Sequence, residues 1–132
     1  MIFVDTSFWI ALTSRADARH DEATQLLHRY GNERLITSTQ VRGETWTFLR
    51  RRSGHEAAVA FLDALDGTSR AEVVFVGEDV EADALRWLRR HDEREYSFVD
   101  ATSFAVMRTL RIHRAFAFDA DFDAAGIESL RT

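Results

Sequence analysis

Four short apolar runs, separated by stretches of helical periodicity, limit the folds open to this chain more than any other feature. The runs of strand type occupy residues 2–5, 34–38, 72–76 and 115–118. Apolar residues at helical spacing occupy residues 18–30, 39–52, 55–66, 79–91 and 98–110. Strands that are almost continuously apolar and alternate with helices indicate a parallel sheet covered on both faces. We therefore predict an α/β fold whose functional site lies beyond the carboxyl ends of the strands.

The sequence contains no sign of a boundary between domains. It has no proline, no low-complexity segment and no internal repeat, and its six glycines are scattered singly. A length of 132 residues is sufficient for one hydrophobic core. We expect residues 1–132 to form one domain without a linker or a tail.

The N-terminal segment MIFVDTSFWIAL argues against export. It lacks basic residues ahead of its apolar run and carries an aspartate within that run, unlike a signal or transit peptide. No stretch approaches the roughly 18 apolar residues that a membrane span needs. The absence of cysteine fits a reducing compartment. We expect a cytoplasmic protein that is not bound to a membrane.

The basic residues exclude several classes of enzyme. All 17 are arginine, so there is no lysine for a Walker A phosphate site, a Schiff base or a receiver domain. The formal net charge of −5 disfavours nucleic acid as a partner at first sight. Two bound divalent cations would cancel most of that charge, so the overall charge does not decide the question.

Four acidic residues occur where a doubly wound fold places its site. Asp5 ends the first apolar run and Asp119 ends the last one. Glu44 and Asp100 lie in predicted helices, within otherwise apolar segments. A charge on a buried segment needs a partner. Their occurrence on one side of the fold favours a cation-binding cluster over four unrelated structural roles.

Each of these acids also has a purely structural interpretation. Asp5 is a favourable N-cap for a short helix that begins near Ser7. Ser97 and Asp100 match a capping box, with the acid at the third helical position. Glu44 fits a solvated helix position, although its apolar neighbours predict little exposed surface. Taken singly, capping is the simpler explanation of Asp5 and Asp100.

The segment AFAFDADFDAAG ends an apolar run with Asp119, Asp121 and Asp123 at alternate positions. Like charges this close repel one another, so a cation is the obvious compensation. The segment is not a calcium-binding loop, because the sixth position is alanine instead of glycine and the twelfth is leucine instead of glutamate. A haloacid-dehalogenase-like phosphatase is also excluded, since too few residues follow for the rest of such a fold.

Three segments together resemble a PIN domain, and more closely the VapC toxins of bacterial and archaeal toxin–antitoxin pairs. They are FVDTSFWIAL, ITSTQVRGETWTFLRRR, and YSFVDATSFAVMRTL followed by AFAFDADF. They span nearly the whole chain, and their order and spacing are far more specific than any single motif. The resemblance implies one α/β/α domain with a parallel sheet of about five strands. It also implies an acidic pocket that binds Mg²⁺ or Mn²⁺ and cleaves single-stranded RNA.

Matched motif by motif, the resemblance makes Asp5, Glu44, Asp100 and Asp119 the catalytic acids. Asp5 and Asp100 are the implied principal metal ligands, and Asp119 is a ligand directly or through water. Glu44 is implied as a ligand or as the group that orients the attacking water. Divalent cations held by carboxylates activate water and neutralise charge on a phosphate, so that no histidine is required.

Neighbouring residues are assigned less directly by the resemblance. Asp121 occupies a position that varies in the family, so its role as a further metal ligand stays open, and Asp123 is expected in a solvated loop. Thr6 and Ser7 lie beside Asp5 and are candidates to hold its carboxylate by hydrogen bonds. Plain helix capping explains these two residues equally well.

Arginines and aromatic residues are candidates to hold RNA. The arginines are Arg50, Arg51 and Arg52 in one run, and Arg86, Arg89, Arg90 and Arg94 in a second group. The aromatic residues are Trp9, Trp46, Phe98 and Phe104. A solvated helix face is the simpler explanation of the arginines, and core packing or a subunit contact that of the aromatic residues. His20 is expected to be an ordinary surface residue.

The predicted function is therefore that of a toxin ribonuclease inhibited by a VapB-like antitoxin, with a homodimer or a larger toxin–antitoxin assembly expected. One alternative is a non-toxin PIN nuclease that acts in RNA processing or on DNA ends; the short chain, without an added domain, disfavours it. The other is a binding module whose acids serve only an interaction. The complete set of four acids disfavours that second alternative.

Overall fold

The computed structural model describes all 132 residues and is built around a parallel sheet of five strands. The strands are β1 (Ile2–Val4), β2 (Leu35–Ser38), β3 (Ala71–Val74), β4 (Arg114–Phe116) and β5 (Glu128–Ser129). Their spatial order is β3-β2-β1-β4-β5, and every neighbouring pair is parallel. The strand that begins the chain is therefore the central one. Its Phe3 lies opposite Ile36 on one side and Ala115 on the other.

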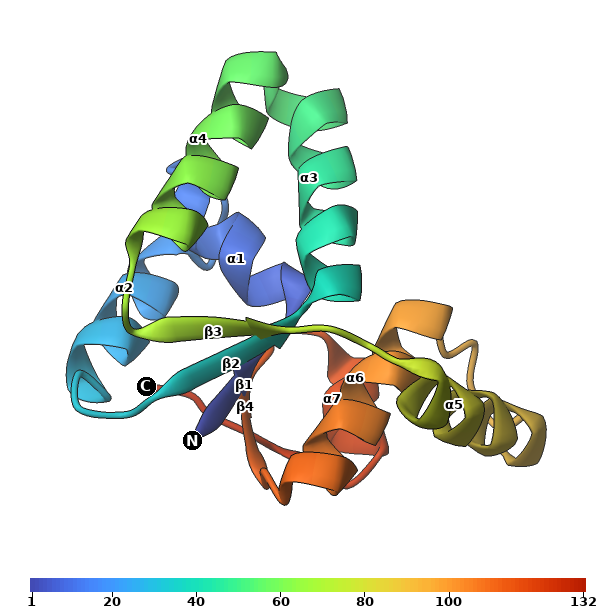
Figure 1. Ribbon diagram of the computed structural model, residues 1–132. Coiled ribbons are helices and arrows are strands. Elements are labelled where there is room, and N and C mark those ends of the chain that lie inside the picture. Colours follow the sequence, from blue (N-terminus) through green and yellow to red (C-terminus); the bar gives the residue numbers. More distant parts are fainter.

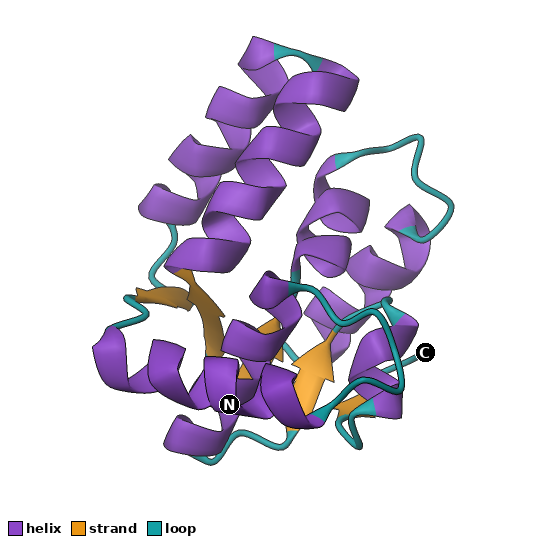
Figure 2. Ribbon diagram, turned by 90° about the vertical axis from the view of Figure 1, so that its right-hand side faces the viewer, coloured by secondary structure: helices purple, strands orange, loops and turns teal.

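Seven helices cover the two faces of the sheet (Figure 1). They are α1 (Thr6–Thr13), α2 (His20–Arg29), α3 (Thr39–Ser53), α4 (His55–Gly67), α5 (Glu78–Arg90), α6 (Phe98–Leu110) and α7 (Ala120–Ala124). Right-handed crossovers place α1 to α4 on one face and α5 to α7 on the other. The helices α3 and α4 form a hairpin that projects away from the sheet, as Figures 1 and 2 both show. Gly54 joins them at φ 94°, a conformation in which a side chain would be strained.

The hydrophobic core lies on both sides of the three inner strands. All residues of β1 and β2 are buried, as are Ala115 and Phe116 of β4. The edge strand β3 departs from the expectation that every strand is buried, because it has a sheet neighbour on one side only. Phe75, which follows it, is 82 % exposed. None of the seven helices combines the length and the hydropathy that a membrane-spanning segment requires.

The predicted elements are present, and their ends lie within two residues of the predicted ones. The five-residue helix α7 and the two-residue strand β5 were not located from the sequence, because neither is long enough to show a period. Gly31 follows the end of α2 as expected, but its φ is not positive. The residues with positive φ at helix ends are instead Gly54 after α3, Arg111 after α6 and Gly126 after α7.

Candidate active site

An acidic pocket of about 290 Å³ opens at the carboxyl ends of the strands. The structure brings together there the four acids that the resemblance makes catalytic, Asp121, whose role was left open, and Glu95, which the sequence analysis did not name. The acidic residues that line the pocket are Asp5, Glu44, Glu95, Asp100, Asp119 and Asp121. They come from the ends of β1 and β4, from α3, α6 and α7, and from the loop before α6. The predicted location of the site follows from this topology, because parallel strands end at one edge of the sheet.

Asp5 is fixed by a hydrogen-bonded chain that links the ends of β1 and β4. Its Oδ2 accepts hydrogen bonds from the Ser7 backbone N (3.1 Å) and from Ser7 Oγ (2.7 Å). Ser7 Oγ in turn accepts a hydrogen bond from the Phe118 backbone N at 2.9 Å. Asp5 is thus the N-cap of α1 and also a wall of the pocket, so its two interpretations do not exclude each other. Thr6 lines the pocket, but its hydroxyl does not hold the carboxylate, because the buried Oγ1 has no hydrogen-bond partner.

Asp100 likewise combines a structural and a site position. Ser97 Oγ accepts a hydrogen bond from the Asp100 backbone N at 2.9 Å, and Asp100 Oδ2 accepts one from the Ser97 backbone N at 3.3 Å. The predicted capping box is therefore present at the start of α6. The same carboxyl group is buried against the pocket, only 5 % exposed. The structure is thus compatible with both interpretations of Asp100, as a helix cap and as a residue of the acidic pocket.

Three carboxylates converge closely enough to share one cation. One oxygen each of Asp100, Asp119 and Asp121 lies within 4.8 Å of the other two. Asp119 is the N-cap of α7, because its Oδ1 accepts a hydrogen bond from the Asp121 backbone N at 2.9 Å. Asp121 is also paired with Arg94, whose Nε and Nη2 both lie 2.8 Å from its Oδ1. Asp123 is exposed and points elsewhere, although it lies in α7 and not in a loop as expected.

Glu44 lies at the mouth of the pocket and is exposed, which corrects the expectation that it has little exposed surface. The reason is that α3 projects from the sheet, so that its polar face meets solvent even where apolar residues flank it in the sequence. Glu44 is shared with a second hollow, lined also by Thr47, Phe48, Arg51 and Arg52. The Glu44 carboxylate is therefore accessible from solvent, unlike the buried carboxyl groups of Asp5 and Asp100.

Burial and mutual repulsion make two of the acids hard to ionise. Burial raises the pKa of Asp5 to about 6, against the lowering effect of its hydrogen bonds from Ser7. Burial, and next the charges of Asp5 and Asp119, raise the pKa of Asp100 to about 7. A cation between these groups would remove the repulsion and favour their ionised forms.

The oxygen-only donor set fits a hard divalent cation. Six carboxylates and the hydroxyls of Thr6, Ser7 and Ser97 surround the pocket, without a thiol or an imidazole among its lining residues. Such a set suits Mg²⁺ or Mn²⁺ and is unlike the nitrogen and sulfur sites typical of zinc. The unpartnered Thr6 hydroxyl and the raised pKa values of Asp5 and Asp100 are also in keeping with a site that is completed by a bound group.

Two residues of the site were missed or misplaced by sequence reasoning. Glu95 lines the pocket, and the only signal for it was its position two residues before the Ser97 capping box. Arg94 was grouped with the arginines that were candidates to hold RNA, but it is paired with Asp121, 27 positions away in the sequence. A pair of this kind depends on how the loop before α6 folds back over α7, which no local pattern reveals.

The remaining candidates divide by burial. Trp9 and Phe104 are core residues, 7 % and 2 % exposed. Trp46 is half-buried, with its ring edge against His55, whereas Phe98 is exposed near the pocket end of α6. His20 is half-buried, and its Nδ1 lies 2.9 Å from the carbonyl oxygen of Ala11. Core packing is therefore confirmed for the first two aromatic residues.

The arginine groups also separate. Arg51 and Arg52 adjoin the acidic pocket through the hollow beside Glu44, whereas Arg50 is exposed outside that hollow. Arg86 lies 3.9 Å from Asp83 within the same helix. Arg89 and Arg90 are exposed on α5 and line none of these pockets.

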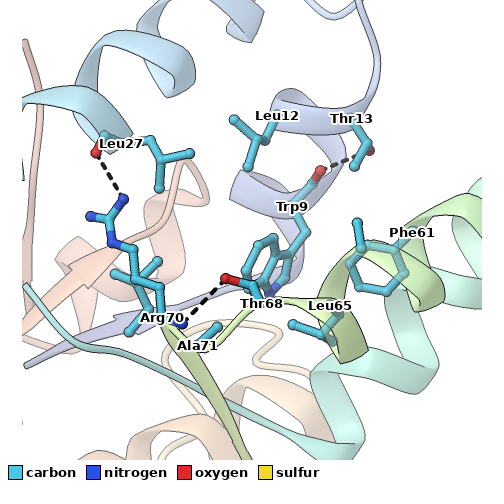
Figure 3. A pocket seen from close by; sticks show the side chains of 11 residues that line it. Trp9, Leu12, Thr13, Leu27, Phe61, Leu65, Thr68, Arg70 and Ala71 are labelled. Carbon is cyan, nitrogen blue, oxygen red and sulfur yellow. Dashed lines mark hydrogen bonds between the residues drawn. The ribbon is translucent and has the colours of Figure 1, made fainter. Parts of the chain in front are cut away.

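A separate pocket of about 290 Å³ between α1, α2 and α4 is mainly apolar (Figure 3). Trp9, Leu12, Phe61 and Leu65 are among its lining residues, and Arg70 closes one end. The Arg70 guanidinium donates hydrogen bonds to the backbone carbonyl oxygens of residues 27, 30 and 33. These residues lie in the last turn of α2 and in the loop that follows it. Residues of α1 line both this pocket and the acidic one, so the two pockets adjoin the same helix.

A parallel sheet of this order with a cluster of carboxylates at its carboxyl edge defines a class of protein. A family model described as the PIN domain matches residues 2–128, and the chain belongs to the PIN-domain family. It is 55 % identical over 131 residues to the "23S rRNA-specific endonuclease VapC20" of two Mycobacterium tuberculosis strains, with 99 % of this chain and 98 % of that protein covered.

Solved structures agree with this result. The crystal structure of M. tuberculosis VapC20, described as a sarcin-ricin loop cleaving toxin, matches with a TM-score of 0.95 and 53 % identity over 100 % of both chains. FitAcB from Neisseria gonorrhoeae shares the fold, with a TM-score of 0.70 at 14 % identity over 98 % of this chain and 96 % of that one. The VapC-type resemblance, the nuclease class and the α/β/α fold predicted from the sequence are confirmed.

Proposed function

We propose that this chain is a toxin endoribonuclease that uses Mg²⁺ or Mn²⁺ to cleave the sarcin–ricin loop of 23S rRNA in the cytoplasm. The observation that carries the proposal is the convergence of Asp100, Asp119 and Asp121 in one pocket with Asp5. The full-length similarity to VapC20 supports the choice of substrate. This choice is narrower than the RNA substrate expected from the sequence.

The positions of the acids support the following proposed roles. When bound, a divalent cation supplies an activated water and neutralises charge on the phosphate. Asp100, Asp119 and Asp121 would hold the cation, and Asp5, kept in place by Ser7, would complete the negative field around it. Glu44 at the mouth orients the attacking water or accepts its proton.

The test is cleavage by the purified chain of 23S rRNA in intact ribosomes, with Mg²⁺ or Mn²⁺ and with a chelator. Mapping of RNA ends should show one cut in the sarcin–ricin loop with the wild type and none with Asp5→Asn. Cleavage of another RNA, without cleavage of 23S rRNA, would refute the proposed substrate but leave the proposed ribonuclease activity standing. Cleavage of DNA ends in preference to RNA would favour the alternative of a non-toxin PIN nuclease.

We further propose that a VapB-like antitoxin inhibits the enzyme by placing a basic side chain in the acidic pocket. A guanidinium there would form charge-assisted hydrogen bonds to the carboxylates and take the place of a cation. Asp5→Ala should then bind the antitoxin at least about tenfold more weakly than the wild type, since one charged hydrogen bond contributes about 1.5–3 kcal/mol. Co-purification followed by titration calorimetry measures this. Equal affinity of both proteins, or RNA that is cleaved in the complex, would exclude this mode of inhibition.

The apolar pocket in Figure 3 offers such a partner a second anchor. Residues of α1 line both this apolar pocket and the acidic pocket, so one segment of the antitoxin can reach the two pockets. Apolar side chains of the antitoxin would fill it, because most of its lining residues are hydrophobic. Ala64→Glu, at the exposed rim of this pocket, should weaken antitoxin binding, whereas unchanged affinity would remove this pocket from the interface.

We also propose that the chain forms a homodimer. Phe75 beside the edge strand β3 is 82 % exposed, and Leu85 on α5 is 38 % exposed. A second copy that covered these side chains would remove apolar surface from water. Sedimentation should show that the wild type is a dimer and that Phe75→Ser is shifted towards the monomer. A wild type that is monomeric at all concentrations would contradict this assignment.

A further inference from the structure

Two hollows adjoin the acidic pocket along α3. One, of about 380 Å³, shares Glu44 with the acidic pocket and is lined also by Phe48, Arg51 and Arg52. The other, of about 250 Å³, shares Ile10 with the acidic pocket and again includes Phe48 and Arg52. The three hollows are therefore contiguous, and they form a path from the carboxylates towards the tip of the α3–α4 hairpin.

The path contains two arginines that form no ion pair. Arg51 and Arg52 are exposed, and neither takes part in an ion pair. The guanidinium carbon of Arg52 lies 5.0 Å from the centre of the Phe48 ring. This cation–π contact restricts the arginine side chain but leaves its hydrogen-bond donors free. Arg94, by contrast, is the arginine at the acidic pocket that is already paired, with Asp121.

The path also contains acidic groups, which limit what can bind there. Glu44 stands at its start and Asp17 lies in the hollow beside Ile10. An RNA strand whose cleaved phosphate lies at the carboxylates of the acidic pocket must place its neighbouring phosphates close to the same negative charges. That placement is favourable only where unpaired cations lie beside these phosphates. Arginine suits this task because its planar donors match phosphate oxygens.

We propose that Arg51 and Arg52, with Phe48 positioning Arg52, bind the phosphates of the RNA strand that flank the cleaved bond. The strand therefore leaves the active site along α3 and not along the arginines of α5. This assignment rests on the proposed ribonuclease function and adds to it the direction of the substrate. It also separates Arg51 and Arg52 from Arg50 and from the second arginine group.

The experiment measures Arg51→Gln, Arg52→Gln and the variant that carries both substitutions. The control is Arg29→Gln, which removes one exposed, unpaired arginine from α2. Cleavage of a sarcin–ricin stem-loop is measured over a range of salt concentrations. Each of the two α3 variants should raise KM by about tenfold and change kcat by less than about twofold. Each should also lower the slope of log KM against log salt by about 0.7, the value for one contact to a single-stranded phosphate. Arg52→Lys should restore the slope, and Arg29→Gln should behave as the wild type.

Three results would overturn the assignment. One is a double variant with the KM and salt slope of the wild type. Another is an Arg90→Gln variant on α5 that raises KM as much as Arg52→Gln does. The third is an α3 double variant that binds RNA normally but has lost binding to the antitoxin, since the arginines would then serve the protein partner. A wild type that cleaves no RNA would instead refute the proposed function, which keeps the two failures distinct.

Discussion

Replacing Asp100 with asparagine should lower RNA cleavage by about a thousandfold and leave the protein folded. A metal ligand contributes several kcal/mol to the transition state, and each 1.36 kcal/mol corresponds to about a factor of ten in rate. The helix start should survive, because an asparagine oxygen can still accept the hydrogen bond from the Ser97 backbone N. In chelator at pH 7.5 the variant should even be more stable by about 1–2 kcal/mol, since a buried carboxylate of raised pKa has been removed.

The control is Ser97→Ala, which removes the 2.9 Å hydrogen bond from the Asp100 backbone N to Ser97 Oγ. It should cost about 1 kcal/mol of stability, as the loss of an N-cap does. Its cleavage should stay within a few-fold of the wild type. Thermal melts in chelator and cleavage with Mg²⁺ measure both properties for the three proteins. If both variants lost the same activity and melted equally early, Asp100 would be a cap and not a ligand.

Without metal, the folded state should become less stable as the pH is raised from about 4 to about 7. The pKa values of Asp5 and Asp100 are about 6 and about 7 in the folded protein, above the ordinary value of 3.8. In this pH window the folded state binds more protons than the unfolded state, so the free energy of unfolding falls as the pH rises. Two groups shifted this far should contribute at least about 2 kcal/mol, because one pKa unit corresponds to about 1.36 kcal/mol. Urea unfolding in chelator at pH 5 and pH 7.5 measures the difference.

Saturating Mg²⁺ or Mn²⁺ should oppose this decline. A cation that binds only the folded state stabilises it by about 2.7 kcal/mol at a hundredfold excess over its Kd. Because binding requires ionised carboxylates, the gain should grow from pH 5 to pH 7.5. Asp5→Asn provides the control, with a smaller pH dependence in chelator and a smaller gain with metal. Melting curves that do not change at any metal concentration would rule out the carboxylate cluster as a cation site.

The sequence determined the class of fold and the edge of the sheet at which to search. Continuous apolar runs such as 2–5 and 115–118 can be satisfied only by strands buried on both faces, and such strands lie parallel between helices. Because parallel strands end at one edge, Asp5 and Asp119 were expected at the same edge of the sheet although 114 positions separate them; that their two strands are neighbours came from the structure. The capping box of Ser97 and Asp100 was equally readable, since a cap depends on residues three positions apart.

Only the tertiary structure decided how these acids are surrounded. Glu44 is exposed because α3 leaves the sheet, and a neighbouring apolar residue in the sequence does not reveal which way a projecting helix faces. Asp121 is paired with Arg94, and Asp100 has a raised pKa, because of groups that come from distant segments. Likewise, Arg52 differs from Arg50 in lining a hollow that Ile10 and Ser14 form together with α3, which depends on how α1 packs against α3. Helix caps and the periodic spacing of apolar residues are local and can be recognised along the sequence. The burial of a side chain and the electrostatic field around it depend on all the residues that the fold brings close to it.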